Sequence, residues 1–160
     1  MAAFGRTNVR QETLREPEGL EVRASVVFPD DPVRRVVVLW SDERRFRRPA
    51  RIDLAGSGWT GPRELRIGVP IETVEKANGK PFVLYGFEWD YGGSIASWDG
   101  GTLGKLPGGC TFYPIFETSD TVSEDALTAV ASDRQFPSDS PAMRAVMPRI
   151  RSMSLRYSQP

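Results

Sequence analysis

The stretch that decides the fold is Phe82-Val-Leu-Tyr-Gly-Phe-Glu-Trp-Asp-Tyr-Gly-Gly-Ser-Ile-Ala-Ser-Trp-Asp-Gly-Gly101. Its first ten residues alternate in a way that predicts one β-strand over 82–91. Alternation would divide the side chains between two faces of that strand. The face expected in the core carries Val83, Tyr85, Phe87, Trp89 and Tyr91. The opposite face carries Phe82, Leu84, Gly86, Glu88 and Asp90, of which Glu88 and Asp90 are expected to meet water.

Paired glycines follow this strand at 92–93, 100–101 and 108–109, a regular spacing of eight residues. Glycine readily takes the positive φ angles that tight hairpin turns require. Turn signals at such intervals are typical of an antiparallel meander. We therefore expect the next strands at 94–98 and 110–117.

The flanking sequence supplies more strands and a few short helices. Alternating apolar residues predict strands over 20–28, 35–40 and 50–54 and a C-terminal strand that includes residues 153–157. Pro29-Asp-Asp-Pro32 predicts a turn whose aspartates accept hydrogen bonds from nearby backbone. Helix start and stop residues predict helices over 70–79, 123–130 and 140–147. The expected fold is a single α+β domain, 1–160, mainly antiparallel β-sheet with one to three short helices packed on it.

Composition excludes several kinds of chemistry. The 21 basic and 21 acidic residues cancel, so no net field favours nucleic acid, and none is expected as a partner. The chain has no histidine, which removes histidine bases, Ser-His-Asp triads and histidine-ligated metals. Its one cysteine, Cys110, forms no internal disulfide and no cysteine zinc site, and is expected to be a core residue. We expect no catalytic residue, no metal and no cofactor.

Five residues are candidates for binding a ligand: Trp59, Glu88, Asp90, Trp98 and Asp99. Two residues apart on a strand, Glu88 and Asp90 would project their carboxylates from one face about 7 Å apart. That spacing suits an acid/base pair or a calcium site, but equally a solvent-facing strand, with Asp90 capping the turn. The aromatic residues are mainly expected in the core, with Trp59 in its glycine-rich loop as the most favoured exception.

One basic cluster and one loop remain. Five arginines, at 44, 45, 47, 48 and 51, could contact phosphate, but their place between two predicted strands favours a solvated loop. Gly101-Thr-Leu-Gly-Lys105 lacks the spacing of a phosphate loop, because Leu106 follows Lys105.

The segments Leu65–Phe82 and Gly86–Gly93 resemble a family of uncharacterised bacterial proteins, often exported, that carry an "IG…E…NG-x-PF…GF-x-WDY-x-G…W-x-GG" signature. Glu18-Gly19, Phe28-Pro29, Trp40-Ser-Asp42 and the region 138–157 fit the same family. The resemblance implies a bacterial source and does not imply any activity or catalytic residue.

A helix that ends in Gly-x-Pro and leads into strands also resembles the α-β-β units of small bacterial envelope and inhibitor proteins. Phe4–Val9 resembles Ala77–Phe82, which would make two related halves, 1–62 and 63–160, with an N-terminal helix truncated. Such a likeness concerns the fold and carries no function.

The leading functional hypothesis is a non-catalytic binding module of the bacterial envelope that recognises an unknown protein partner. The alternatives are a small-ligand or carbohydrate-binding domain and a carboxylate-dependent hydrolase, and an enzyme is the less favoured class. No run approaches the roughly 18 apolar residues of a membrane span, so none is expected. The chain would be periplasmic or secreted if a signal peptide has been removed, and otherwise cytoplasmic. Homo-oligomer formation stays open.

Overall fold

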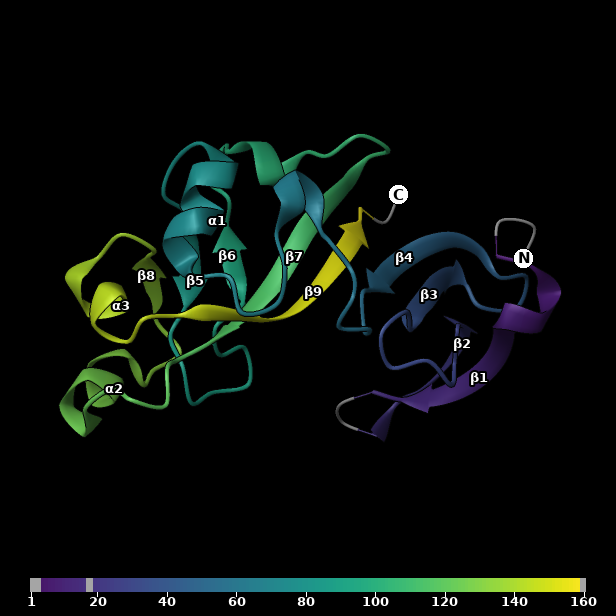
Figure 1. Cartoon of the computed structure of the whole chain (residues 1–160), viewed down its shortest axis with the longest axis horizontal. Helices are drawn as coiled ribbons and strands as arrows, with labels where there is room; N and C mark the ends of the chain where they lie inside the picture. The colour runs from purple at the N-terminus through teal and green to yellow at the C-terminus, as the bar shows by residue number, and fades with distance from the viewer. Residues whose placement is uncertain (1–3, 17–18, 159–160) are drawn as a thin grey trace. The chain divides into compact units, whose positions relative to one another are not determined.

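The computed structural model of the chain describes residues 4–16 and 19–158. Over these ranges it holds nine β-strands and three short α-helices, and most strand pairs are antiparallel (Figure 1). This confirms the predicted α+β class. The chain divides into two compact units, residues 1–59 with 154–160 (unit 1) and residues 60–153 (unit 2).

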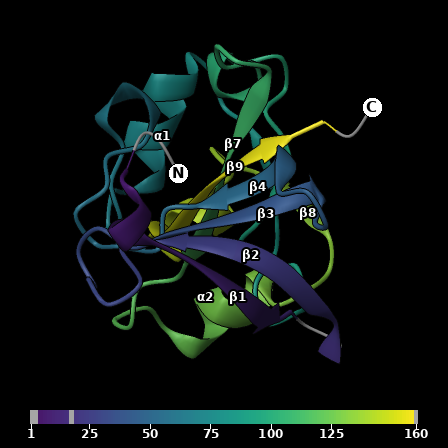
Figure 2. The same ribbon diagram turned by 90° about the vertical axis from the view of Figure 1, so that its right-hand side faces the viewer.

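Unit 1 is an antiparallel sheet whose strands follow the order of the sequence (Figure 2). The strands are β1 (Val9–Arg15), β2 (Glu21–Val27), β3 (Val36–Asp42) and β4 (Arg47–Asp53), and the 3-10 turn η1 (Arg6–Asn8) precedes them. The last residues of β9 (Arg149–Tyr157) pair with β4, Leu155 opposite Ile52. The strands predicted over 20–28, 35–40 and 50–54 are confirmed.

The core of unit 1 is small. Ala24, Val26 and Val37 are buried, and Leu14 and Leu39 pack against them. Strand β1 was not predicted because it carries only two aliphatic side chains among polar ones. It lies at the edge of the sheet, where charged residues are common because they discourage pairing with other chains.

The predicted turn at Pro29–Pro32 is confirmed. Asp31 Oδ1 accepts hydrogen bonds from the backbone N–H groups of Val33 and Arg34, at 2.9 and 3.0 Å. A side-chain hydrogen bond from Arg34, together with these N–H groups, lowers the pKa of Asp31.

Unit 2 contains a three-stranded sheet in the order β6-β5-β8, formed by β5 (Val83–Tyr85), β6 (Ile95–Ser97) and β8 (Gln135–Pro137). Strand β7 (Cys110–Glu117) is the neighbour of β9. The helices are α1 (Ile71–Asn78), α2 (Glu124–Val130) and α3 (Pro141–Ala145), with 3-10 turns η3 (Pro62–Glu64) and η4 (Thr102–Gly104). All three predicted helices are confirmed.

Local signals explain where these helices begin and end. Gly79, at φ 85°, ends α1 in the left-handed conformation, and its N–H bonds to the carbonyls of Glu75 and Lys76. Ser123 and Ser140 cap α2 and α3 by accepting a hydrogen bond from a backbone N–H three residues on. Arg144 then ties α3 to α1 through Glu75, at 2.6 Å.

The core of unit 2 is aromatic at its centre. Phe82, Phe112 and Phe116 are fully buried. The ring of Phe82 lies 5.0 Å from that of Trp98 and 5.8 Å from that of Phe116, between centroids. Trp98 in turn stacks on Phe112 at 6.3 Å.

The prediction of one strand over 82–91 is wrong in length and in face. Strand β5 ends at Tyr85, and residues 88–93 form a loop that leads to β6. Phe82 and Leu84 are buried, whereas Trp89 and Tyr91 are 63% and 71% exposed. The backbone leaves the extended conformation after Phe87, since Glu88 has φ 67°, so the alternation no longer reports which side faces the core.

Candidate functional site

The loop of residues 88–93, here called the aromatic loop, is held at both ends by backbone hydrogen bonds. Before the loop, the N–H of Phe87 bonds to the Val130 carbonyl at 2.8 Å, and at its end the Gly93 carbonyl accepts from the N–H of Phe116 at 2.9 Å. Inside the loop, Gly92 N–H bonds to the Trp89 carbonyl at 2.7 Å, and Gly93 N–H returns to Gly86 at 3.1 Å. The loop is therefore a closed, hydrogen-bonded turn.

Two glycines allow the chain to approach its neighbours at the base of this loop. A Cβ atom at Gly93, where φ is 70°, would clash with the carbonyl oxygen of Phe116. A Cβ atom at Gly86 would clash with the carbonyl oxygens of Val130 and Ser132. Gly93 and Gly86 thus have a packing role, which fixes the position of the exposed residues between them.

Trp89 differs from the other three tryptophans in its hydrogen bonding. The indole N–H groups of Trp40, Trp59 and Trp98 donate to Ser25 Oγ (3.1 Å), the Arg35 carbonyl (3.2 Å) and the Phe112 carbonyl (2.9 Å). Within residues 4–16 and 19–158, the Trp89 side chain has neither a hydrogen bond nor a ring contact. It is a large aromatic side chain, 63% exposed, with no hydrogen-bonding or ring-stacking partner in the described chain.

Tyr91 lies on the same loop and is also exposed. Its ring is 6.0 Å from that of Tyr85, tilted by 40°. Trp89 and Tyr91 are thus two large, exposed aromatic side chains on one turn, and exposed apolar surface gathered in this way often marks an interaction site.

A hollow of about 380 Å³ lies beside the loop. Its charged lining residues are Glu88, Asp90, Glu117 and Arg151. Among the described residues none of these four side chains has an ion-pair partner within 4 Å. The predicted candidates Glu88 and Asp90 therefore do line a concave surface, but from a turn and as exposed side chains.

Glu117 and Arg151 were not predicted as site residues. They come from β7 and β9, far along the chain from the aromatic loop. No local pattern marks them, because only the pairing of distant segments brings them to the hollow.

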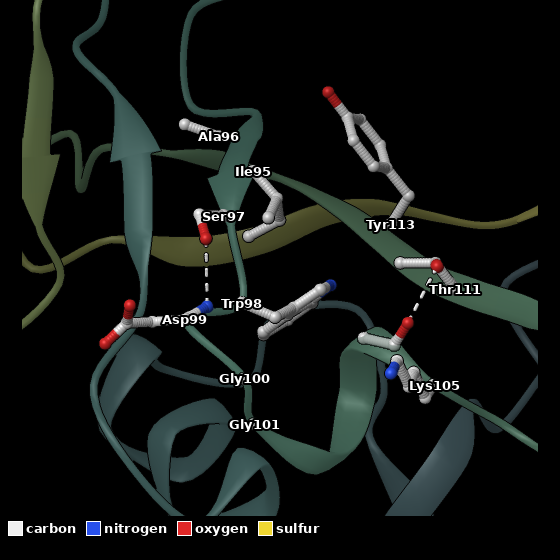
Figure 3. A pocket seen from close by; sticks show the side chains of 11 residues that line it. Ile95, Ala96, Ser97, Trp98, Asp99, Gly100, Gly101, Lys105, Thr111 and Tyr113 are labelled. Atoms are coloured by element: carbon white, nitrogen blue, oxygen red, sulfur yellow. Dashed lines mark hydrogen bonds between the residues drawn. The ribbon is translucent and has the colours of Figure 1, made fainter.

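The other candidates occupy different places. Trp98 is 6% exposed and Asp99 is exposed, and both line a second pocket of about 400 Å³ between β6 and β7. Figure 3 shows its lining side chains around the central Trp98 ring. Asp99 pairs with Lys80 at 3.2 Å, and Lys105 lines the pocket without an ion-pair partner in the described chain. Trp59 belongs to unit 1, half-buried.

The edge of β7 beside this second pocket is poorly suited to accept another strand. Phe116 N–H bonds to the Gly93 carbonyl and the Phe112 carbonyl accepts from Trp98, so both point toward β6. Alternation places the backbone of Pro114 on that same side, where proline has no N–H to donate. Pro114 and Trp98 together block extended pairing along this edge of β7.

The solvated loop predicted for the basic cluster is only partly right, because Arg44 and Arg45 lie in a turn whereas Arg47, Arg48 and Arg51 belong to β4. Arg44, Arg45, Arg47 and Arg48 are exposed. Arg51 differs, because it binds both Glu16 oxygens at 2.8 and 3.0 Å and Asp53 at 3.1 Å.

Burial and charge shift the titration of this group. Burial raises the pKa of Asp53, since desolvation outweighs the attraction of Arg51 and the negative charge of Glu16 adds to it. Burial alone would lower the pKa of Arg51, but its two carboxylate partners reverse that and raise it. This ion-pair cluster was not predicted, because Glu16 lies in the connection between β1 and β2, far along the chain from Arg51 and Asp53 in β4.

The described residues hold neither a metal-binding group of side chains nor a helix suited to span a membrane. No group of three His, Cys, Asp or Glu side chains within 4–16 and 19–158 is arranged to hold a metal ion. Over the same ranges, none of the helices has both the length and the apolar character that crossing a bilayer requires.

Comparisons with protein-family models, with curated proteins and with solved structures gave no match. The resemblance to exported bacterial proteins and the internal repeat stay predictions.

Proposed function

We propose that the chain is a non-catalytic binding module that recognises another protein through the aromatic loop. The observation that carries this is Trp89, the tryptophan whose indole N–H finds no partner in the described chain and whose side chain is 63% exposed. Tryptophan and tyrosine dominate the energetics of protein interfaces, because they bury large areas and lose little conformational entropy.

The geometry of the loop supports recognition without prior ordering. Its turn is closed by the Gly92–Trp89 and Gly93–Gly86 hydrogen bonds. A preorganised loop loses little conformational freedom when it binds, so more of the buried aromatic area contributes to affinity. An envelope location is part of the proposal and rests on the resemblance alone.

The experiment is capture of a partner, followed by measurement of its affinity. The purified chain is immobilised and exposed to a periplasmic extract, and the protein that it retains is identified by mass spectrometry. That protein is then purified, and its affinity for the chain is measured by calorimetry. We expect Trp89→Ala to weaken binding at least about tenfold. Leu20→Ala is the matched control, because Leu20 is also a large exposed apolar residue, 62% exposed, but lies elsewhere. Equal affinity of Trp89→Ala and the wild type would refute the proposal.

A small-ligand site in the pocket between β6 and β7 is a second candidate. Its volume of about 400 Å³ lies in the range of known ligand sites, and polar Asp99, Lys105 and Tyr113 line it. A fragment screen by NMR tests it: ligands of this site should shift the Gly100 and Gly101 amides. A hydrolase gains no support, since such chemistry needs a carboxyl group in an apolar setting and Glu88, Asp90 and Asp99 are exposed.

A further inference from the structure

The hollow beside the aromatic loop is lined by aromatic side chains and by charged side chains that are mostly acidic. Buried Phe87 and Phe116 line it together with exposed Trp89. Of its four charged side chains, three are carboxylates and one is Arg151. An occupant of positive charge is therefore favoured, while phosphate groups of nucleic acid or anionic lipid are repelled.

The exposed Trp89 ring is suited to the same charge. Tryptophan is the strongest cation–π acceptor among the aromatic side chains. This chain already uses that contact elsewhere, with Arg34 over Phe28 at 4.3 Å and Arg23 over Phe46 at 4.7 Å. Within the described residues no cation lies over Trp89.

We propose that the partner protein presents an arginine side chain, whose guanidinium group enters this hollow against Trp89 and binds its carboxylates. This inference rests on the proposed function, since it names the chemistry of the partner at the same loop. Arginine is preferred to lysine because its planar guanidinium stacks on an indole while its N–H groups bind carboxylates bidentately.

A short peptide probes this chemistry without knowledge of the partner. The peptide Ac-Gly-Arg-Gly-Arg-Gly-NH2 is titrated into the ¹⁵N-labelled chain, and the Trp89 indole signal is assigned with Trp89→Phe. We expect saturable shifts at the Trp89 indole and at the amides of residues 88–92 and 117–118. The same peptide with citrulline in place of arginine keeps the shape and loses the charge, and should cause no such shifts.

Matched variants test the carboxylates. Glu88→Gln and Glu117→Gln should each weaken peptide binding about threefold, and added salt should weaken it further. Glu124→Gln, an exposed carboxylate elsewhere in unit 2, should leave it unchanged. Equal binding of the citrulline peptide, shifts confined to another surface, or no effect of either glutamine variant would overturn the inference.

Two outcomes separate this inference from the function it rests on. If Trp89→Ala abolishes capture of the natural partner but the arginine peptide does not bind, the proposed binding function is kept and the inference of an arginine in the hollow is rejected. The four exposed arginines at 44, 45, 47 and 48 offer the same chemistry from a second copy of the chain. If sedimentation shows self-association that Arg44→Glu with Arg48→Glu removes, a second copy is the occupant and the partner assignment is overturned.

Discussion

At the scale of the residue, Asn78 gives a structural reason for the "NG" and "W-x-GG" parts of the sequence signature. Its side chain is 1% exposed. It donates to the carbonyls of Lys80 and Trp98, at 3.1 and 3.2 Å, and accepts from the N–H of Leu103 at 3.2 Å. A Cβ atom at Gly101 would clash with this amide. Asn78, Trp98 and Gly101 thus hold α1 to the turn after β6.

Asn78→Ala should lower the free energy of unfolding by about 2–3 kcal/mol, because the buried Leu103 N–H loses its partner. Urea unfolding followed by circular dichroism measures this. Gly101→Ala should also be destabilising alone, and a double-mutant cycle should show that it costs less once Asn78 is alanine. Simple additivity of the two changes would contradict the contact.

Asp53 predicts a dependence of stability on pH. Its pKa is raised in the folded chain, so between its ordinary value and the raised value the native state binds more protons than the unfolded state. Stability contributed by this group therefore falls as pH rises through that window. Asp53→Asn removes the charge with little change of shape. The unfolding free energy of the variant relative to wild type should increase from about pH 4 upward, measured by urea unfolding. A difference that is constant or shrinks with pH contradicts the assignment.

At the scale of the element, the end of helix α1 depends on Gly79. Its φ of 85° is costly for any residue with a Cβ atom, although the space around it is open. Gly79→Ala should lower the free energy of unfolding by about 1–2 kcal/mol. Gly79→Asn is the control and should lose less, because asparagine tolerates this conformation. Thermal unfolding of both variants measures the two losses of stability. Equal losses for Gly79→Ala and Gly79→Asn would refute a purely conformational cost.

Elements defined by local signals could be predicted, and those defined by partners could not. The caps Ser123 and Ser140 and the C-terminal Gly79 mark helices in the sequence itself. Strand β8, only three residues long, exists because it pairs with β5. The prediction of one strand over 82–91 was wrong because the alternation of residue types continues past Phe87, where the backbone already turns.

The candidate surface could be predicted only in part. Glu88 and Asp90 were identified as acidic residues of one segment, and they do share a hollow. The exposure of Trp89 and Tyr91 could not be foreseen, because aromatic residues in a strand-like pattern are usually buried. The decisive fact is the lack of an internal partner for one indole, which only the packed structure reveals.

At the scale of the whole molecule, the two units differ in the size of their cores. Among the twelve largest fully buried side chains of the described residues, Val26 alone belongs to unit 1. The others include three phenylalanines, three leucines and two isoleucines of unit 2. Burial of apolar area supplies most of the stabilisation of a core, so unit 2 should resist local opening more strongly.

Hydrogen exchange measured by mass spectrometry tests this difference. We expect peptides from β2 and β3 to exchange with opening free energies at least about 2 kcal/mol lower than peptides from β7 and α1. Val26→Ala should lower the protection of β2 and β3 further, because it removes the largest fully buried side chain of unit 1. Val74→Ala is its counterpart in the larger core and should act on α1 and its neighbours. Uniform protection along the chain, with both variants lowering all peptides equally, would mean that the two cores open as one cooperative unit in spite of their different sizes.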